Sequence, residues 1–321
     1  MMLNPKECFA EYFKGHKEHL FPSRVILELT NRCNLSCAMC PRQYINFRKG
    51  FLKYDLFKKA VDEISEYPGT GIIPFFRGES LLHPDFIPML RYIKSKGIIS
   101  VQLSTNAALL NEKMSEAILD SGIDFISFSL DGFNERIYNK IRRGADFGLI
   151  VRNIKNFLKK KRRRALPQTQ VSLVETRLTK KTIPDFVARW IDLVDRVRVY
   201  KEHSSGGRFG SLKDGNKSGM KIRKPCLKLV TEMAVYYNGD VAICNHDWNR
   251  KQFIGNTAKQ TLRDIWNNRQ YQALRRMHLE GNINRGIVCY GCGHWKAYYS
   301  KDGLIGRLYT KKSDIFMGED V

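Results

Sequence analysis

The sequence predicts an α/β protein, a partial (β/α)6 barrel of the TIM type followed by a small α+β domain. Short apolar runs rich in β-branched residues, such as FISFSL at 125–130, alternate with helical patterns over about 180 residues. Alternation of this kind implies parallel strands joined by helices. The runs are almost continuously apolar, as expected of strands buried on both faces. After residue 203 the sequence changes to Gly-, Ser- and Lys-rich loop, which separates a second, smaller region.

About six βα units suit an open barrel better than a closed eightfold one. The strands are expected at 24–30, 71–77, 98–105, 124–131, 169–176 and 196–202. The helices between them are expected at 55–66, 84–96, 112–121, 150–161 and 182–194.

The length of 321 residues exceeds what a single core usually supports, so we expect one large and one smaller domain. We divide the chain into a helical lead-in at 1–22, the partial barrel at 23–203 and the C-terminal domain at 204–321. In the C-terminal domain, two alternating segments flank Asn238-Gly239, a strong signal for a β-hairpin. A helical segment follows at 262–280, and the chain ends in a Lys- and Tyr-rich tail.

The formal net charge of +23 favours an anionic partner: a phosphorylated small molecule, nucleic acid or an anionic membrane surface. The one block of like charge, 159–164, is more simply the solvated end of a helix, where cations suit the helix dipole, than a nucleic-acid contact. No apolar run approaches the roughly 18 residues of a membrane span, and the N-terminus lacks the apolar core of a signal peptide. We therefore expect a cytoplasmic protein.

The eight cysteines fall into a lone residue, a group of three and a group of four. They are Cys8; Cys33, Cys37 and Cys40; and Cys226, Cys244, Cys289 and Cys292. In a long chain expected in the cytoplasm, this grouping favours metal binding over disulfides. Cys8 is most simply a lone thiol.

Each expected strand ends in small, polar or charged residues. The first five are followed by the group of three cysteines, Arg77-Gly78-Glu79-Ser80, Ser104-Thr105-Asn106, Ser129-Leu130-Asp131-Gly132 and Glu175-Thr176-Arg177. Any one of these is explained by turn or capping chemistry. Because the C-terminal ends of barrel strands build the active site, all five together predict a site at that face.

The group Cys33, Cys37 and Cys40 supplies three thiols, one fewer than structural zinc sites and ordinary iron–sulfur clusters take. Three thiolates on a four-iron cluster leave one iron open to another ligand. The same spacing also fits one face of a buried helix, but four neighbours argue against it: Asn31, Asn34, Ser36 and Pro41. The ligand interpretation is favoured.

At these residues the chain resembles the radical S-adenosylmethionine (SAM) superfamily, over about residues 22–202. In that family three cysteines, here Cys33, Cys37 and Cys40, bind a 4Fe–4S cluster whose open iron takes the amino and carboxylate groups of SAM. The resemblance implies that a flavodoxin- or ferredoxin-type donor supplies an electron and that the C5′–S bond of SAM breaks. The 5′-deoxyadenosyl radical so formed removes a hydrogen atom from the substrate.

The resemblance also implies which residues hold SAM. Gly78 and Glu79 match the motif that receives the methionine amino group; it usually reads GGEP, and Phe76, Arg77 and Ser80 depart from it. Met39 matches a position that packs near the adenine. The positions that contact the SAM carboxylate or ribose are matched by Ser104, Asn106, Ser129, Asp131 and Arg142, with Arg143 an equal candidate for the arginine by spacing.

Cys226, Cys244, Cys289 and Cys292 make a complete four-ligand set, and the turn at Gly239 is expected to present Cys244. Their spacing alone leaves structural zinc and an iron–sulfur cluster equally open. The region is similar to the SPASM or twitch extensions of radical SAM proteins, in particular to twitch enzymes of the 2-deoxy-scyllo-inosamine dehydrogenase type. Since four cysteines are too few for the two auxiliary clusters of a full SPASM domain, the resemblance implies one fully ligated auxiliary 4Fe–4S cluster.

These inferences indicate a radical SAM oxidoreductase that dehydrogenates a small hydroxylated or sugar-like substrate and passes an electron to the auxiliary cluster. The basic side chains favour an anionic substrate. One alternative is a peptide (RiPP) maturase that forms a cross-link or an epimer, which the short lead-in disfavours because such enzymes often carry a leader-binding domain. Another is an RNA-modifying enzyme, which the charge favours although no RNA-binding module is visible.

The sequence does not identify a catalytic base. The titratable or polar residues at the expected barrel mouth are Glu175, Arg177, Tyr200, Glu202 and His203. Each is more commonly a solvated loop residue than a catalytic one.

Overall fold

The structure is a computed structural model that describes residues 21–162, 164–201, 223–248, 250–299, 306–311 and 313–315. Several features singled out in the sequence lie outside these residues. They are nearly all of the lead-in, Cys8, Arg163 of the basic run, Glu202, His203 and most of the linker.

Six parallel strands form the open barrel that the sequence predicts. They are β1 (Arg24–Leu27), β2 (Gly71–Ile73), β3 (Gln102–Thr105), β4 (Phe125–Ser129), β5 (Gln168–Glu175) and β6 (Arg196–Lys201). β1 pairs with β2, and β3 to β6 pair in sequence order, all in parallel. A single bridge between Ile72 and Val101 joins β2 to β3, so the strands follow one another around the barrel in chain order.

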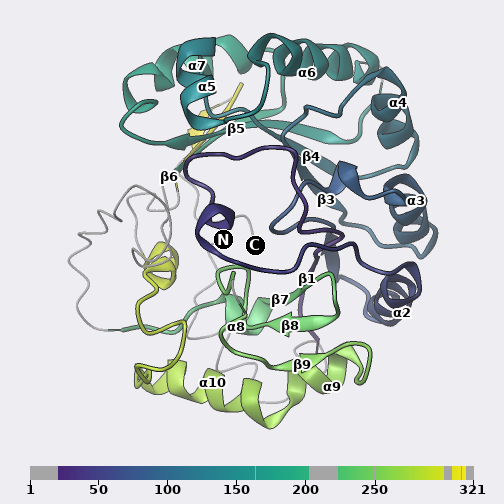
Figure 1. The fold of residues 1–321 in the computed structure, drawn as a ribbon, viewed down its shortest axis with the longest axis vertical. Coiled ribbons are helices and arrows are strands. Elements are labelled where there is room, and N and C mark those ends of the chain that lie inside the picture. Colours follow the sequence, from purple (N-terminus) through teal and green to yellow (C-terminus); the bar gives the residue numbers. More distant parts are fainter. Residues whose placement is uncertain are drawn as a thin grey trace.

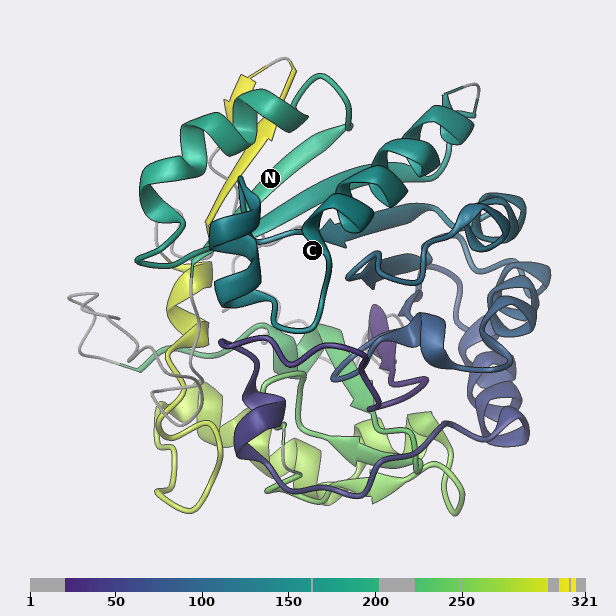
Figure 2. The same ribbon diagram turned by 45° about the horizontal axis from the view of Figure 1, so that its top comes forward.

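Helices cover the outer side of these strands, and Figure 2 shows α2, α3 and α4 in a row along it. The predicted helices are α2 (Tyr54–Ser65), α3 (Phe86–Ser95), α4 (Glu112–Asp120), α6 (Phe147–Lys161) and α7 (Ile183–Trp190). Each buries an apolar stripe; in α2 this stripe is Phe57, Ala60, Val61 and Ile64. A further short helix, α5 (Glu135–Ile141), was not expected from the sequence. It is capped by Asn134, whose side chain accepts a hydrogen bond from the N–H of Ile137.

The C-terminal region joins the barrel at β1. After the short helix α8 (Lys228–Thr231), β7 (Glu232–Val235) and β8 (Asp240–Ala242) form the predicted antiparallel hairpin, and β9 (Gly255–Asn256) follows. β7 pairs with β1 in parallel, which gives one sheet in the order β2-β1-β7-β8-β9. The two regions therefore share a sheet, a long-range pairing that the sequence did not predict.

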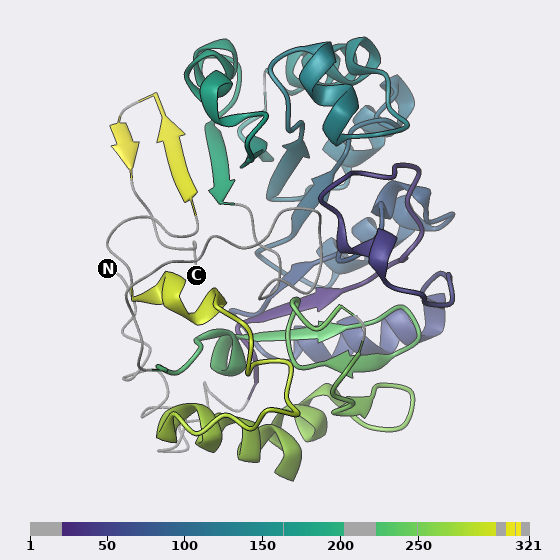
Figure 3. The same ribbon diagram turned by 60° about the vertical axis from the view of Figure 1, so that its left-hand side comes forward.

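The chain also extends the other edge of the barrel. β10 (Gly306–Thr310) pairs antiparallel with β6, and β11 (Ser313–Ile315) pairs with β10 (Figure 3). The sequence analysis expected only a Lys- and Tyr-rich tail here. Two short segments carry too few residues to show a clear period of two.

The helix expected at 262–280 is broken into α9 (Leu262–Asn267) and α10 (Arg269–Glu280), which lie beneath β7, β8 and β9 in Figure 1. The break is at Asn268, whose backbone is extended. Its side-chain oxygen accepts a hydrogen bond from the N–H of Tyr271, and its amide donates to the carbonyl of Ile254. Asn268 thus caps a new helix, and capping competes with continuation of the first one.

One continuous hydrophobic core runs through both regions. It includes Phe128 and Trp190 from the barrel and Val241, Trp266 and Tyr271 from the C-terminal region. Shared burial of this kind stabilises the junction as well as each part. Among the described residues, no helix is both long and apolar enough to cross a bilayer.

Candidate functional site

The three-cysteine segment is an irregular loop that follows β1 and crosses the inner side of the barrel (Figure 1). Its middle is held to the end of α5, because the N–H groups of Ser36 and Ala38 donate to the carbonyls of Arg143 and Ile141 at 3.0 and 2.7 Å. The alternative of one buried helix face is therefore wrong. The polar neighbours that argued against it are used to fold the loop.

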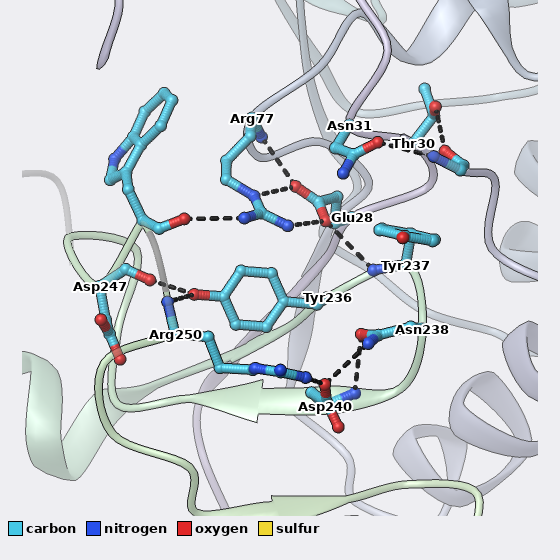
Figure 4. Close-up of polar contacts among 12 residues, drawn as sticks. Glu28, Thr30, Asn31, Arg77, Tyr236, Tyr237, Asn238, Asp240, Asp247 and Arg250 are labelled. Carbon is cyan, nitrogen blue, oxygen red and sulfur yellow. Dashed lines mark hydrogen bonds and ion pairs between the residues drawn. The ribbon is translucent and has the colours of Figure 1, made fainter. Parts of the chain in front are cut away.

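The base of the loop is closed by Thr30 and Asn31. The Asn31 side chain donates to the carbonyl of Arg48 and accepts from the N–H of Gly50, both at 2.8 Å, and the Thr30 hydroxyl donates to the carbonyl of Gly50 at 2.7 Å (Figure 4). These bonds satisfy buried polar groups with backbone partners. They fix where the chain enters and leaves the cysteine segment.

The chemistry of the three thiols fits a metal cluster. Cys37 is buried, Cys33 and Cys40 are half-buried, and none forms a disulfide. Burial raises the pKa of all three, that of Cys37 to about 11, while Arg142 acts in the opposite direction. The neighbouring thiols raise the pKa of Cys37 and Cys40 further. Buried thiols this close together become thiolates readily only when a cation replaces their protons, as cluster assembly does.

Gly78 brings the second strand-end motif directly against the cysteine segment. A Cβ on Gly78 would lie 2.2 Å from the carbonyl oxygen of Thr30 and 2.5 Å from that of Arg32. The N–H of Glu79 donates to the same Arg32 carbonyl at 2.8 Å. Only glycine permits this approach, so the predicted SAM motif packs on the backbone that leads into Cys33.

Glu79 is buried and is hydrogen-bonded only by neutral groups. Its carboxylate accepts from the Thr105 hydroxyl and the Asn106 N–H, both at 2.8 Å, and from the Leu81 N–H at 3.4 Å. Burial raises the pKa of Glu79, and these bonds offset part of that effect. A buried carboxylate of this kind favours a cationic partner such as an amino group.

The predicted residues on β3 and β4 meet at one edge. The side-chain amide of Asn106 donates to the Asn34 side chain at 2.9 Å and lies 3.9 Å from the sulfur of Cys33. The hydroxyls of Ser104 and Ser129 are 3.3 Å apart. The structure thus brings Glu79, Asn106 and the first cysteine into one network.

Asp131 and Arg142 bind each other. Oδ2 of Asp131 accepts from Nε and Nη2 of Arg142 at 2.8 and 2.6 Å, and Oδ1 accepts from the N–H of Val174 at 2.6 Å. Burial lowers the pKa of Arg142, but Asp131 and Cys37 raise it above its ordinary value, so this arginine stays charged. The pair ties the end of β4 to the end of α5, next to the cysteine segment.

A cavity of about 460 Å³ opens beside the cysteine segment. Met39, Ile141 and Leu178 line it with apolar surface, and Ala38 and Thr176 complete its wall. Lys140, Arg143 and Arg177 are exposed side chains that line the same cavity. Arg142 and Arg143, which were equal candidates by spacing, therefore differ: one is in a buried ion pair and the other faces this cavity.

The four C-terminal cysteines also come together. Cys244 directly follows the β7–β8 hairpin, as its spacing from Gly239 predicted. Burial raises the pKa of the Cys226, Cys244 and Cys289 thiols, and each of the three is raised further by one or more others of the set, Cys292 included. The described residues hold no group of three or more His, Cys, Asp or Glu side chains arranged for a single metal ion.

The candidate bases are not isolated acids or bases. Glu175 forms ion pairs with Lys201 at 2.8 Å and Arg307 at 3.1 Å. Burial alone would raise its pKa, but the two cations hold the pKa below its ordinary value. Arg177 lines the cavity, and Tyr200 is exposed.

Three of the five described residues of the basic run 159–164 form ion pairs. Lys160 binds Glu112 and Glu116 at 2.7 and 2.6 Å, and Lys161 binds Asp195 at 3.0 Å. Arg164 binds Asp120 at 2.8 Å. These contacts favour the interpretation of a solvated helix end.

Comparison with known proteins places this site in a family. The model of the radical SAM superfamily matches residues 27–206, more than half of the chain, and the model of an iron–sulfur cluster-binding domain, SPASM, matches residues 226–293. The chain therefore belongs to the radical SAM superfamily. Its second match begins at Cys226 and ends one residue after Cys292.

Curated relatives cover much of the chain. It is 27% identical over 293 residues to the tungsten-containing aldehyde ferredoxin oxidoreductase cofactor-modifying protein of Pyrococcus furiosus, covering 78% of this chain and 82% of that protein. It is 24% identical over 290 residues to the S-adenosyl-L-methionine-dependent 2-deoxy-scyllo-inosamine dehydrogenase of Niallia circulans, covering 85% and 93%. A probable GTP 3′,8-cyclase of Methanococcus maripaludis is 33% identical, over 40% of this chain and 43% of that protein.

Solved structures share the fold. The complex of BtrN with AdoMet and 2-DOIA matches with a TM-score of 0.56 at 19% identity, covering 81% of this chain and 88% of BtrN. Streptococcus suis SuiB bound to its precursor peptide SuiA matches with a TM-score of 0.69 at 15% identity, covering 91% and 77%. These likenesses confirm the predicted partial barrel with a C-terminal domain.

Together these findings confirm the class of protein. It is a radical SAM oxidoreductase with a SPASM domain, and it uses SAM and two 4Fe–4S clusters. Enzymes of this superfamily need a reductant and a substrate.

One pair of residues at this site, Glu28 and Arg77, was not predicted from the sequence. Two features could have indicated the pair: an acidic residue in an apolar strand, and an arginine where the motif usually has glycine.

We expect the two cysteine groups to hold separate clusters. Changing Cys33, Cys37 and Cys40 together to Ala should lower the iron content from about eight to about four per chain and abolish reductive formation of 5′-deoxyadenosine. Changing the C-terminal four should also leave about four irons but preserve cleavage of SAM. Metal analysis and chromatography measure both, with Cys8→Ala as the control that keeps full iron. Continued cleavage in the first variant, or zinc in the C-terminal site, contradicts the assignment.

Gly78→Ala should weaken SAM binding at least about tenfold, or ~1.4 kcal/mol, because a Cβ would push the motif away from the Thr30 and Arg32 carbonyls. Equilibrium dialysis of the cluster-loaded protein measures the Kd. Gly286→Ala is the matched control, since no atom lies within 4 Å of the position of its Cβ. Equal affinities in the two variants would show that the close approach does not matter.

Proposed function

We propose that this enzyme dehydrogenates a secondary alcohol of a small, hydroxylated, anionic substrate, with the auxiliary cluster as electron acceptor. Cys33, Cys37 and Cys40 would hold the cluster that binds SAM, and Cys226, Cys244, Cys289 and Cys292 the auxiliary cluster. A flavodoxin- or ferredoxin-type protein would be the electron donor. The observation that carries the substrate proposal is the cavity beside the cysteine segment, with its apolar wall and cationic residues.

The three cavity cations supply the preference for an anion. Among the described residues, Lys140, Arg143 and Arg177 have no ion-pair partner, in contrast to the basic run at the end of α6. Their charge is therefore available to a ligand. A cavity of about 460 Å³ falls within the range of small-molecule sites, and cations at its mouth raise the local concentration of anionic substrates.

The chemistry divides between the cofactors and the chain. When bound, the cluster and SAM supply a radical that takes the hydrogen atom from the carbinol carbon of the substrate. The substrate would then lose its hydroxyl proton to solvent and one further electron to the auxiliary cluster, which would leave a ketone and complete a two-electron oxidation. The chain contributes position and exclusion of water: Glu79 would hold the amino group of SAM, and the cavity residues would hold the substrate beside the cysteine segment.

The likeness to a dehydrogenase supports this proposal over its alternatives. The Niallia relative, named as a 2-deoxy-scyllo-inosamine dehydrogenase, is covered over 93% of its length. The peptide-maturase alternative has SuiB as a structural neighbour. The RNA alternative is disfavoured by the paired basic run.

The proposal predicts transfer of deuterium from a carbinol carbon. Anaerobic enzyme with SAM and dithionite should move deuterium from C–D positions of the anion myo-inositol 1-phosphate, and less readily from those of the cation 2-deoxy-scyllo-inosamine, into 5′-deoxyadenosine and form the ketone. Mass spectrometry measures both products. Transfer from the Cα or Cβ of a deuterated Cys-containing peptide, with none from either polyol, would favour the maturase and overturn the dehydrogenase.

The cavity cations should set the preference for an anion. In the double variant Arg143→Gln/Arg177→Gln, KM for a phosphorylated polyol substrate should rise about tenfold or more, because two charge-assisted contacts are lost. The KM for its unphosphorylated analogue should stay within about twofold. Lys113→Gln, which removes an exposed charge from α4 outside the cavity, is the control. An equal rise for both substrates would contradict charge recognition.

A further inference from the structure

Arg77 and Glu28 form a buried bidentate ion pair at the junction of the two cysteine regions. Arg77 stands directly before Gly78 and Glu79, and Glu28 directly follows β1. Nε and Nη2 of Arg77 donate to Oε1 and Oε2 of Glu28 at 2.6 and 2.7 Å (Figure 4). The two side chains are 5% and 0% exposed, so the pair is shielded from solvent.

The same pair holds the C-terminal region. The remaining nitrogen of Arg77, Nη1, donates to the carbonyl of Trp248 at 2.7 Å. Oε2 of Glu28 accepts from the N–H of Tyr237, in the β7–β8 turn, at 3.1 Å. The guanidinium also lies 4.1 Å from the ring centre of Tyr236. One arginine, which directly precedes Gly78 and Glu79, thus contacts the residue after β1 and the chain after β8.

The chain after β8 is the segment that carries Cys244. The N–H of Asp247 donates to the carbonyl of Cys244 at 3.1 Å, and the N–H of His246 donates to its sulfur at 3.4 Å. The Tyr236 hydroxyl donates to the carbonyl of Asp247 and accepts from the N–H of Arg250 at 3.0 Å (Figure 4). Arg77 and Tyr236 together therefore hold the backbone of Asp247, Trp248 and Arg250.

The contacts continue to the next cysteine. The side chain of Gln252 accepts from the N–H of Val288 at 2.7 Å and donates to the carbonyl of Gly286 at 3.2 Å. Val288 immediately precedes Cys289. The N–H of Gln252 also donates to the carboxylate of Asp247 at 3.2 Å. Contacts therefore connect Arg77, next to the Gly78-Glu79 motif, with the segments of two C-terminal cysteines.

We infer that the Glu28–Arg77 pair is a positioning device that fixes the auxiliary-cluster segment against the SAM motif. This inference rests on the cluster assignment made in the proposed function. A buried ion pair is a weak source of stability, because the cost of desolvation offsets the attraction. The planar fork of arginine instead fixes several acceptors at set angles, which suits alignment of two sites. Such an alignment would keep a substrate between the two clusters within reach of both.

Two variants separate alignment from folding. Glu28→Leu/Arg77→Met replaces the pair by apolar side chains of similar size, a change that buried ion pairs often tolerate. Arg77→Lys keeps the charge but lacks the fork that binds Glu28 and Trp248 at once. The control is Arg24→Met, which removes the 3.2 Å ion pair to Glu232 that joins the same strands, β1 and β7, at their other end.

The distance between the two clusters tests the inference. In cluster-loaded enzyme reduced with dithionite, pulsed dipolar electron paramagnetic resonance measures the distribution of that distance. We expect a distribution at least about 1.5-fold wider, or shifted beyond its original width, in the double variant and in Arg77→Lys, with about eight irons retained. The distance distribution of Arg24→Met should superimpose on that of the unaltered protein.

An unchanged distribution in either iron-replete Arg77 variant would overturn the inference, as would the same broadening in Arg24→Met. The measurement needs no substrate, so its outcome does not depend on whether the dehydrogenase reaction is correct. An error in the cluster assignment would show instead in the iron content of the cysteine variants.

Discussion

The position of β1 between β2 and β7 is the constraint on which both halves of the molecule depend. Three residues, Arg24, Val25 and Ile26, are paired on both sides, and Arg24 lies opposite Gly71 on one side and Glu232 on the other. The SAM motif follows β2, the β7–β8 hairpin leads to Cys244, and the first cysteine segment follows β1 itself. A one-residue slip in either pairing would reverse the faces of a strand and separate these three segments.

Three buried carboxylates at this end of the sheet are satisfied in different ways. Glu28 and Asp131 each bind an arginine in a charged pair. Glu79 accepts only neutral donors and has a raised pKa. Burying a charge is costly unless it is paired, so the first two are complete and rigid while Glu79 retains an attraction for a cation. The amino group of SAM, which the resemblance to the family implies at this residue, would supply such a cation.

The sequence predicted what is encoded locally. Strand runs, helical stripes, the Asn238-Gly239 hairpin and both cysteine groups depend on short-range patterns, and the structure contains them. The sequence alone could not show that β7 pairs with β1, or that Arg77 binds Glu28, because these contacts join residues far apart in the chain. The break at Asn268 was missed since helical spacing continues across it and only the capping bonds reveal the new start. Helix α5 and the strands β10 and β11 were too short for their periods to be recognised.

What the large positive charge implies for function depends on where each cation lies. Arg77 and Arg142 form ion pairs with buried carboxylates at the site. Acidic residues on neighbouring elements pair with Lys160, Lys161 and Arg164. Lys140, Arg143 and Arg177 remain at a cavity beside the cysteine segment. The size of the charge alone favoured a phosphorylated small molecule, nucleic acid or an anionic membrane surface alike, and its distribution supports the proposed small anionic substrate. Since a field focused at the mouth of a cavity acts on the approach of a ligand as well as on its affinity, the same three residues would bear on both the capture and the orientation of that substrate.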